Sequence, residues 1–291
     1  MKLRSIVTCT AVATAFVCLS VPFNMGGCAD DVSHGIGQAT GQSAPAGTDN
    51  YIRAGEKALK TTTLNEADED AMGQSVAMTL TSRYGLNDDE TLARYVNLVG
   101  LTVASATPRP DGNWVFGVIN SSEVNAYAGP NGYILITKGA LAKMQDEAEL
   151  AGVLAHECAH VANQDGLNAV KNAGYLDAGM EAGKGADQNF AKFGQLTDGV
   201  VDVVIKKGYS RDQEMTADVN AVKFLVAAGY DPNSYLHFLQ RVKAAGGGSA
   251  GSSLMSTHPG LDQRIAKVSS QIKSGQSGAT LKDRFVQNVK P

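Results

Sequence analysis

The sequence predicts an α+β protein that is mainly helical, with one small sheet near the middle of the chain. Long segments with apolar residues at helical spacing flank a central stretch of short β-prone runs. Turn signals rich in glycine, asparagine and serine separate those runs. Of the 291 residues, 43% are hydrophobic and 19% are charged. These values indicate a folded globular protein and exclude a disordered chain or a protein with many membrane spans.

The first helix is expected over residues 64–84, where the apolar spacing is helical. Asn87 and the acidic residues after it are typical of the cap and first turn of a second helix, which runs to about Ala106. Three short strands should follow, over residues 114–119, 124–128 and 133–137. Further helices are expected over residues 139–143, 146–163, 210–228, 234–245 and 262–272.

Residues 166–208 contain eight glycines and many alanines, which make weak helices at best. Two interpretations of this stretch remain open. It is either a lid that gates the entry of a substrate or a poorly ordered insertion.

The first 27 residues have the layout of a bacterial lipoprotein signal. Lys2 and Arg4 precede an apolar run over residues 6–23, and two glycines stand directly before Cys28. By this pattern residues 1–27 are removed, and Cys28 becomes the lipidated first residue of an exported chain. The alternative is an uncleaved anchor helix, since the run is only slightly shorter than the roughly 20 residues that span a bilayer.

A flexible tether is expected over residues 28–50, where glycine, serine and threonine dominate. The folded domain is expected over residues 51–291. Cys158 is its only thiol after Cys28, so a core or a metal, rather than disulfides, must stabilise it. The net charge is 25 − 29 = −4 and no cluster of Lys and Arg is present, which excludes nucleic acid as an expected partner.

Residues 156–160 read His-Glu-Cys-Ala-His, the pattern H-E-x-x-H, within a strongly apolar predicted helix. Because four residues make about one helical turn, the imidazoles of His156 and His160 emerge on one face and can bind one metal ion. Glu157 is rotated by about 100° and is placed to act on the water of that ion. A helix with a solvated polar face is the alternative, but the apolar neighbours indicate burial, where these groups need partners.

A catalytic zinc site needs a third protein ligand and an open fourth position. The extended pattern H-E-x-x-H-x-x-G-x-x-H is excluded, because Asn163 and Gly166 stand where its glycine and third histidine should be. A carboxylate from a separate helix is the remaining common solution, and Glu214 is the best-placed candidate. Asp218 lies four residues later on the same face and can fix the tautomer of a ligand imidazole.

Four segments in order carry a resemblance to a known family. They are residues 156–160, the segment from Glu214 to Asp218, Asn125-Ala126-Tyr127-Ala128 before a glycine turn, and Thr257-His258-Pro259 followed by Arg264-Ile265. Together they resemble the CAAX prenyl endopeptidase and HtpX-like zinc metallopeptidases, over about residues 64–272. The resemblance implies a zincin-like fold, with the small sheet beside the H-E-x-x-H helix.

By this resemblance, His156, His160 and Glu214 are the ligands of one zinc ion per chain and Glu157 is the catalytic base. Many relatives carry several membrane helices, whereas this chain has none after residue 23, so it looks like a soluble, periplasmic branch of the family. That branch implies polypeptide substrates among unfolded or misassembled envelope proteins, and it argues against prenylated substrates.

The resemblance also implies that Asn125, Ala126 and Tyr127 border the substrate cleft, and that His258 and Arg264 lie close to the metal. His258, Arg264 and Tyr209 are all candidates for stabilising the oxyanion of the reaction. His258 has further interpretations: it occupies the open zinc position and keeps the enzyme shut, or it is a residue of the cleft wall or a helix-capping histidine.

A binding or chaperone-like protein that retains zinc for stability is the alternative function. Glu157 argues against it, because a purely structural site has no use for a base beside an open ligand position.

Overall fold

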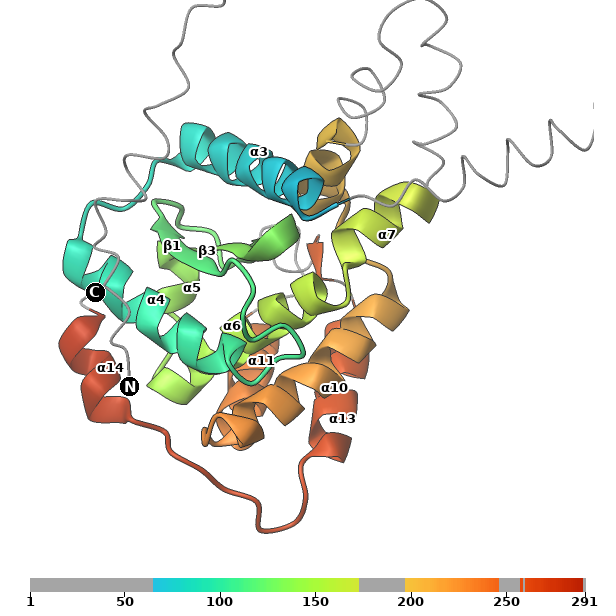
Figure 1. Ribbon diagram of the computed structural model, residues 1–291. Coiled ribbons are helices and arrows are strands. Elements are labelled where there is room, and N and C mark those ends of the chain that lie inside the picture. Colours follow the sequence, from blue (N-terminus) through green and yellow to red (C-terminus); the bar gives the residue numbers. More distant parts are fainter. Residues whose placement is uncertain (1–64, 173–196, 246–256, 259, 290–291) are drawn as a thin grey trace, which may run out of the picture. The chain divides into compact units, whose positions relative to one another are not determined.

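The computed structural model describes residues 65–172, 197–245, 257–258 and 260–289 (Figure 1). The expected signal, Cys28 and the tether lie outside these ranges, as do residues 173–196 of the glycine-rich stretch. None of the helices in the described ranges is both long enough and apolar enough to cross a bilayer.

The described residues contain one three-stranded sheet, whose strands lie in the order β1-β3-β2. β1 (Val115–Ile119) runs parallel to β3 (Tyr133–Thr137), and β2 (Ala126–Gly129) runs antiparallel to it. A short turn, η1 (Pro130–Gly132), joins β2 to β3. The small sheet predicted from the sequence is therefore confirmed, and β2 forms one of its edges.

Helices cover both faces of the sheet, which confirms the α+β class. Figure 1 shows α3 (Glu66–Tyr84) on one face, with α4 (Glu90–Ala104) and α6 (Glu147–Ala162) on the other. Three further helices pack around α6 or against one another: α10 (Arg211–Ala227), α11 (Pro232–Ala244) and α13 (Leu261–Gln271). All of these lie within a few residues of the helices expected from the sequence.

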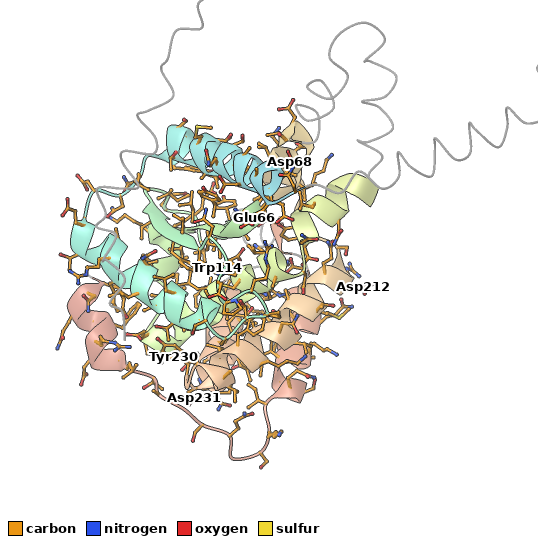
Figure 2. The ribbon with its side chains drawn as sticks, in the orientation of Figure 1. Glu66, Asp68, Trp114, Asp212, Tyr230 and Asp231 are labelled. Atoms are coloured by element: carbon orange, nitrogen blue, oxygen red, sulfur yellow. The ribbon has the colours of Figure 1, made fainter. Side chains whose placement is uncertain are left out.

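α6 is the centre of the fold, because every residue from Glu147 to Val161 is buried. Its apolar side chains join those of the sheet and the surrounding helices in one hydrophobic core, to which Trp114 (labelled in Figure 2) and Phe116 also contribute. Burial of this apolar surface fixes the position of the helix, so polar side chains on α6 are held in defined places.

Local capping sets where α6 and α10 begin. The side chain of Asp146 accepts a hydrogen bond from the backbone of Glu149 at the start of α6. Ser210 and Gln213 form a reciprocal capping box at the start of α10. Glu214 consequently stands in the first turn of α10, where a negative charge is favourable.

Four further short elements are present among the described residues, and the sequence predicted them only in part. They are α5 (Lys138–Leu141), α7 (Asp165–Asn172), the π-helix η2 (Val203–Lys207) and α14 (Lys282–Asn288). α5 was expected, and α7 and η2 fall in the stretch expected to form weak helices. α14 was not expected, since it is short and its position depends on contacts with distant residues.

Glu147, the first residue of α6, is completely buried and holds α14 in place. Its carboxylate accepts hydrogen bonds from Tyr95 at 3.0 Å and from Tyr230, labelled in Figure 2, at 2.7 Å. Arg284 of α14 pairs with both carboxylate oxygens. The backbone N–H of Glu147 donates to the carbonyl of Thr280, so the segment before α14 also caps α6.

α6 and α11 approach closely at Gly152. A Cβ atom at this position would lie 2.6 Å from the Cβ and 2.8 Å from the ring of Tyr235, which is closer than real atoms pack. We expect Gly152→Ala to lower the free energy of unfolding by about 1–3 kcal/mol, because it forces the two helices apart. Urea denaturation followed by circular dichroism measures this change.

Gly166→Ala is the matched control, because the nearest atom to an added Cβ there is 3.6 Å away. This helical glycine should tolerate alanine with unchanged or slightly higher stability. Equal stability of Gly152→Ala and the unmodified protein would contradict the packing argument.

Candidate metal centre and active site

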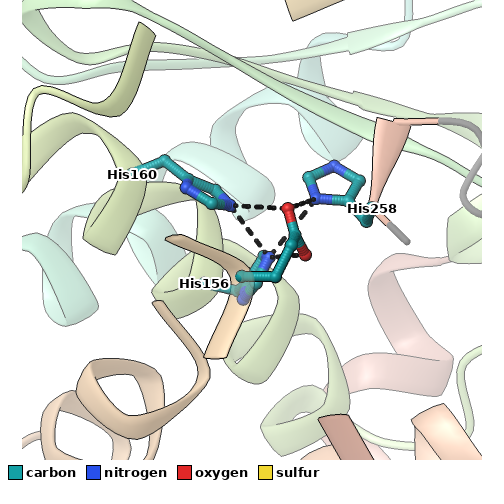
Figure 3. Close-up of side chains that lie close together, drawn as sticks. His156, His160 and His258 are labelled. Atoms are coloured by element: carbon teal, nitrogen blue, oxygen red, sulfur yellow. Dashed lines mark hydrogen bonds and ion pairs between the residues drawn. The ribbon is translucent and has the colours of Figure 1, made fainter. Parts of the chain in front are cut away.

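α6 brings His156 and His160 together on one face, as their spacing predicts. Their Nε2 atoms are 3.1 Å apart, and the two imidazoles meet edge to face with centroids 4.6 Å apart. Both side chains are almost completely buried. Figure 3 shows them pointing toward one another, with His258 on the opposite side of a shared carboxylate.

Glu214 supplies that carboxylate from the first turn of α10. Its Oε1 lies 3.4 Å from His160 Nε2, and its Oε2 lies 3.4 Å from His156 Nε2. Potential ligand atoms of four residues, His156, His160, Glu214 and His258, all lie within 4.8 Å of one another. The structure therefore brings together the three expected ligands and adds one more nitrogen donor.

Each of the two α6 histidines is held by a second carboxylate. His156 Nδ1 lies 3.0 Å from Asp218 Oδ1, and His160 Nδ1 lies 2.7 Å from Asp165 Oδ2. An N–H at each Nδ1 can donate to its carboxylate, which leaves the lone pair on each Nε2 directed into the cluster. Histidine ligands in metal sites are commonly oriented in this way.

The donor set fits a divalent cation. With each Nδ1 proton donated to its carboxylate, two Nε2 lone pairs and a carboxylate oxygen face one another, an arrangement that a bound cation would stabilise. Burial alone would lower the pKa of His160, but Asp165 and Glu214 raise it to about 10. The same negative potential that holds a proton there attracts a metal ion, which would displace the proton.

Glu214 is ionised at neutral pH. Its burial would raise the pKa, but His258 and the Arg264 guanidinium hold that pKa well below its usual range. Carboxylate and imidazole donors in this number are the common ligands of a catalytic zinc ion.

Glu157 lies beside the cluster with one oxygen to spare. It is almost completely buried, and its Oε1 is 3.6 Å from His258 Nε2. Its Oε2 has no hydrogen-bond partner among the described residues. A buried carboxylate oxygen without a partner is rare, because burial removes the water that would solvate it. This oxygen is available to accept a proton.

Arg264 from α13 lies behind the cluster and is also buried. Its Nε and Nη2 each donate to Asp218 at 2.9 Å, and its Nη1 pairs with Glu214 Oε2 at 3.1 Å. Tyr235 completes this network, because its hydroxyl donates to Asp218 Oδ1 and accepts from Arg264 Nη2, both at 2.8 Å. The guanidinium thus links the carboxylates of Glu214 and Asp218.

His258 and Tyr209 cover the cluster. His258 Nδ1 is 3.0 Å from Glu214 Oε1 and 3.4 Å from His156 Nε2. The ring of Tyr209 stacks on His160, with centroids 4.1 Å apart at an angle of 26°. The backbone N–H of Tyr209 donates to the carbonyl of Thr257, the residue before His258.

Asn125, Ala126 and Tyr127 lie at the start of the edge strand β2, where an extended substrate could pair. All three are buried. Two contacts lie along this edge: the hydroxyl of Tyr209 donates to the carbonyl of Ala128 at 3.4 Å, and the hydroxyl of Thr257 donates to the side-chain oxygen of Asn125 at 3.3 Å.

Sequence reasoning missed Asp165 and Tyr235. Asp165 follows His160 by five residues, a spacing that brings it back to the imidazole only because the chain turns at Gln164, where φ is 56°. Tyr235 reaches the site from α11 across the close contact at Gly152. A search for acids shortly after the motif could have found Asp165, whereas no sequence signal indicates Tyr235.

Comparisons with known proteins agree with this geometry. A model of peptidase family M48 matches residues 90–272. The chain is 27% identical to the metalloprotease YcaL of Escherichia coli (strain K12) over 244 residues, which are 79% of this chain and 89% of that protein. It is 28% identical to the mitochondrial metalloendopeptidase OMA1 of Schizosaccharomyces pombe over 213 residues, 72% of this chain and 62% of the relative.

The chain is also 25% identical to the beta-barrel assembly-enhancing protease of Escherichia coli (strain K12) over 237 residues. The match covers 78% of this chain but only 48% of that relative. These matches support the family as a whole, and not the narrower likeness to CAAX prenyl endopeptidases and HtpX-like members. Because members of this family are peptidases, the substrates of this chain are polypeptides. The chain belongs to peptidase family M48 and is a metalloendopeptidase.

Proposed function

We propose that this protein is a zinc-dependent metalloendopeptidase that hydrolyses peptide bonds in unfolded or misassembled proteins of the bacterial cell envelope. One observation carries the proposal: Glu157, with an unpaired buried carboxylate oxygen, stands beside the converging donors of His156, His160 and Glu214. A protein that bound zinc only for stability would gain nothing from this unpaired base.

His156, His160 and Glu214 would hold the zinc ion. Bound there, zinc supplies a Lewis acid that lowers the pKa of a coordinated water to about 7 and polarises a carbonyl group. Asp218 and Asp165 keep a proton on each Nδ1, so both imidazoles present their Nε2 lone pairs. Arg264 holds Glu214 and Asp218 in place through its ion pairs.

Glu157 moves the proton in the reaction. Its free Oε2 accepts a proton from the attacking water and then delivers it to the departing amine. Because α6 is buried in the protein core, this carboxylate is kept in one position. This favours catalysis, since the proton transfer needs a defined geometry.

The nitrogen atoms of Arg264 are engaged with Asp218, Glu214 and Tyr235, so we propose that it positions these groups rather than stabilising the oxyanion. His258 and Tyr209 face the cluster and can reach a developing oxyanion. We also propose that His258 restrains the enzyme, because its Nδ1 lies among the ligand atoms and can fill the fourth position.

The substrate class follows from the relatives and from the edge strand. The name of one relative ties it to the assembly of β-barrel proteins, which lie in bacterial outer membranes. An extended, unfolded segment can pair with the main chain of β2, whereas a folded domain cannot present such a segment. Both considerations favour unfolded envelope proteins over folded ones.

We expect Glu157→Gln to reduce the cleavage of unfolded casein by at least about a hundredfold, because it removes the general base. Zinc content should stay unchanged, since Glu157 is not a proposed ligand. Initial rates from fluorescent casein, with zinc measured by mass spectrometry in the same samples, check both points.

Glu90→Gln, the same substitution at an exposed position of α4, serves as the control and should keep full activity. Chelation should inactivate the unmodified protein, and zinc should restore it. Equal activity of Glu157→Gln and the unmodified protein at equal zinc content would exclude this mechanism and favour the chaperone-like alternative.

Only the molecules with an open site would be active in the unmodified protein. His258→Ala should therefore raise kcat/KM by a factor of one divided by that open fraction, because it removes the fourth nitrogen donor. Steady-state cleavage of a quenched fluorescent peptide measures this ratio. If the variant is slower than the unmodified protein, His258 is a catalytic group and does not restrain the enzyme.

We propose export and a lipid anchor on Cys28, from the pattern of residues 1–28. The mature chain purified from bacterial membranes should then begin at Cys28 and carry the mass of attached acyl chains. Intact-protein mass spectrometry tests this expectation, and an unmodified chain that begins elsewhere would rule it out.

A further inference from the structure

The turn that leads from α6 to Asp165 has an unusual backbone. α6 ends at Ala162, and Gln164 then has a φ of 56°. Glycine is the usual residue in this conformation after a helix, because a side chain makes left-handed backbone costly. Gln164 is exposed, so burial of its own side chain does not offset that cost. Interactions with other parts of the chain can offset it.

Glu69 supplies such an interaction from α3. Its Oε1 accepts a hydrogen bond from the side-chain N–H of Gln164, which lies 95 positions later in the chain. Its Oε2 pairs with Arg109 at 3.2 Å. Glu69 is only 6% exposed, and both of its carboxylate oxygens have a partner. Hydrogen bonds to carboxylates are stronger than those between neutral groups, so this contact ties the turn to α3.

α3 is anchored at the residue next to Glu69. The Oδ1 atom of Asp70 accepts hydrogen bonds at 3.1, 3.0 and 3.0 Å from the side chains of Asn113, Asn131 and Tyr133. These contacts fix the first turns of α3 against η1 and the start of β3. Glu69 therefore holds the turn from a defined position.

α10 restrains the same turn from another direction. The side-chain N–H of Gln213 donates to the carbonyl of Asp165 at 3.1 Å and to its Oδ1 at 3.3 Å. The Oδ2 atom of Asp165 then remains for His160 Nδ1, at 2.7 Å. Asp165 is thus held by α10 directly and by α3 through Gln164.

α3 lies before residues 90–272, which match the family model, so that match assigns no role to Glu69. The contacts nevertheless connect Glu69 to a proposed metal ligand through the turn at Gln164 and Asp165. A residue that orients a ligand imidazole typically contributes about 10–100-fold to metal affinity. A residue that fixes the orienting carboxylate shares in this contribution.

We propose that Glu69 is a positioning residue of the metal centre: it acts through Gln164 to keep Asp165 against His160, and it thereby strengthens metal binding. The proposal rests on the function proposed above, in which His160 is a zinc ligand. The alternative is that Glu69 only fastens α3 through Arg109. The two roles differ in whether the effect of Glu69 passes through Gln164.

A double-mutant cycle on zinc affinity separates these roles. The zinc-loaded protein is titrated with a chromophoric chelator, which reports the affinity from the zinc that it removes. Glu69→Ala should weaken zinc binding by about tenfold, the lower end of the range for such partners. Glycine adopts positive φ without strain, so in Gln164→Gly the turn no longer needs Glu69. In that background Glu69→Ala should change the affinity by less than about twofold.

Glu66→Ala is the matched control, because Glu66 is an exposed residue of the same helix (labelled in Figure 2). This variant should keep the zinc affinity of the unmodified protein. Glu69→Gln keeps the size of the side chain and removes its charge, so it should show a smaller loss in the same direction. The cycle is repeated with this variant if Glu69→Ala does not fold.

Unchanged zinc affinity in the Glu69 variants would overturn the positioning role. An equal loss with and without Gln164→Gly would also overturn it, because the effect would then not pass through the turn. Either result leaves the endopeptidase function intact, since the zinc-loaded protein still cleaves casein. If the unmodified protein binds no zinc, the proposed function itself fails, and the positioning role fails with it.

Discussion

The rest of the structure depends on the close approach of several buried ligand atoms. Their mutual electrostatic repulsion would be relieved by a bound cation. Two imidazole nitrogens 3.1 Å apart and the carboxylate of Glu214 meet where no water can separate them. Repulsion would separate these ligand atoms unless a second residue held each ligand side chain in position. Asp218 and Asp165 hold the imidazoles, and Arg264 holds Glu214. The fold is therefore organised to keep acceptors close together.

Helix packing provides this restraint. The site draws on α6, α10, α11 and α13, and close backbone contact at Gly152 lets Tyr235 reach the carboxylate of Asp218. Because the apolar face of α6 is buried along its whole length, its polar residues cannot move without disturbing the core. The same helix therefore contributes to the stability of the fold and carries residues of the active site.

Local patterns predicted the helices, the sheet and the spacing of His156 and His160, because periodicity and caps depend on neighbouring residues. Glu214 has no local signal of its own, and it was predicted because a catalytic zinc site needs a third protein ligand. Asp165, Tyr235 and α14 were missed, since each depends on a turn or on a contact between distant segments. The family resemblance already implied that His258 lies near the metal, whereas its contact with the carboxylate of Glu214 needed the tertiary structure.

The ties between Glu147 and Arg284 join residues 137 positions apart in the chain. Closing so long a loop costs conformational entropy before any contact repays it, and contacts of this kind slow folding. The first turn of the helix that carries the reactive groups is thus completed by one of the most distant pairings among the described residues. We expect the arrangement of the reactive groups on this helix to depend on the docking of α14.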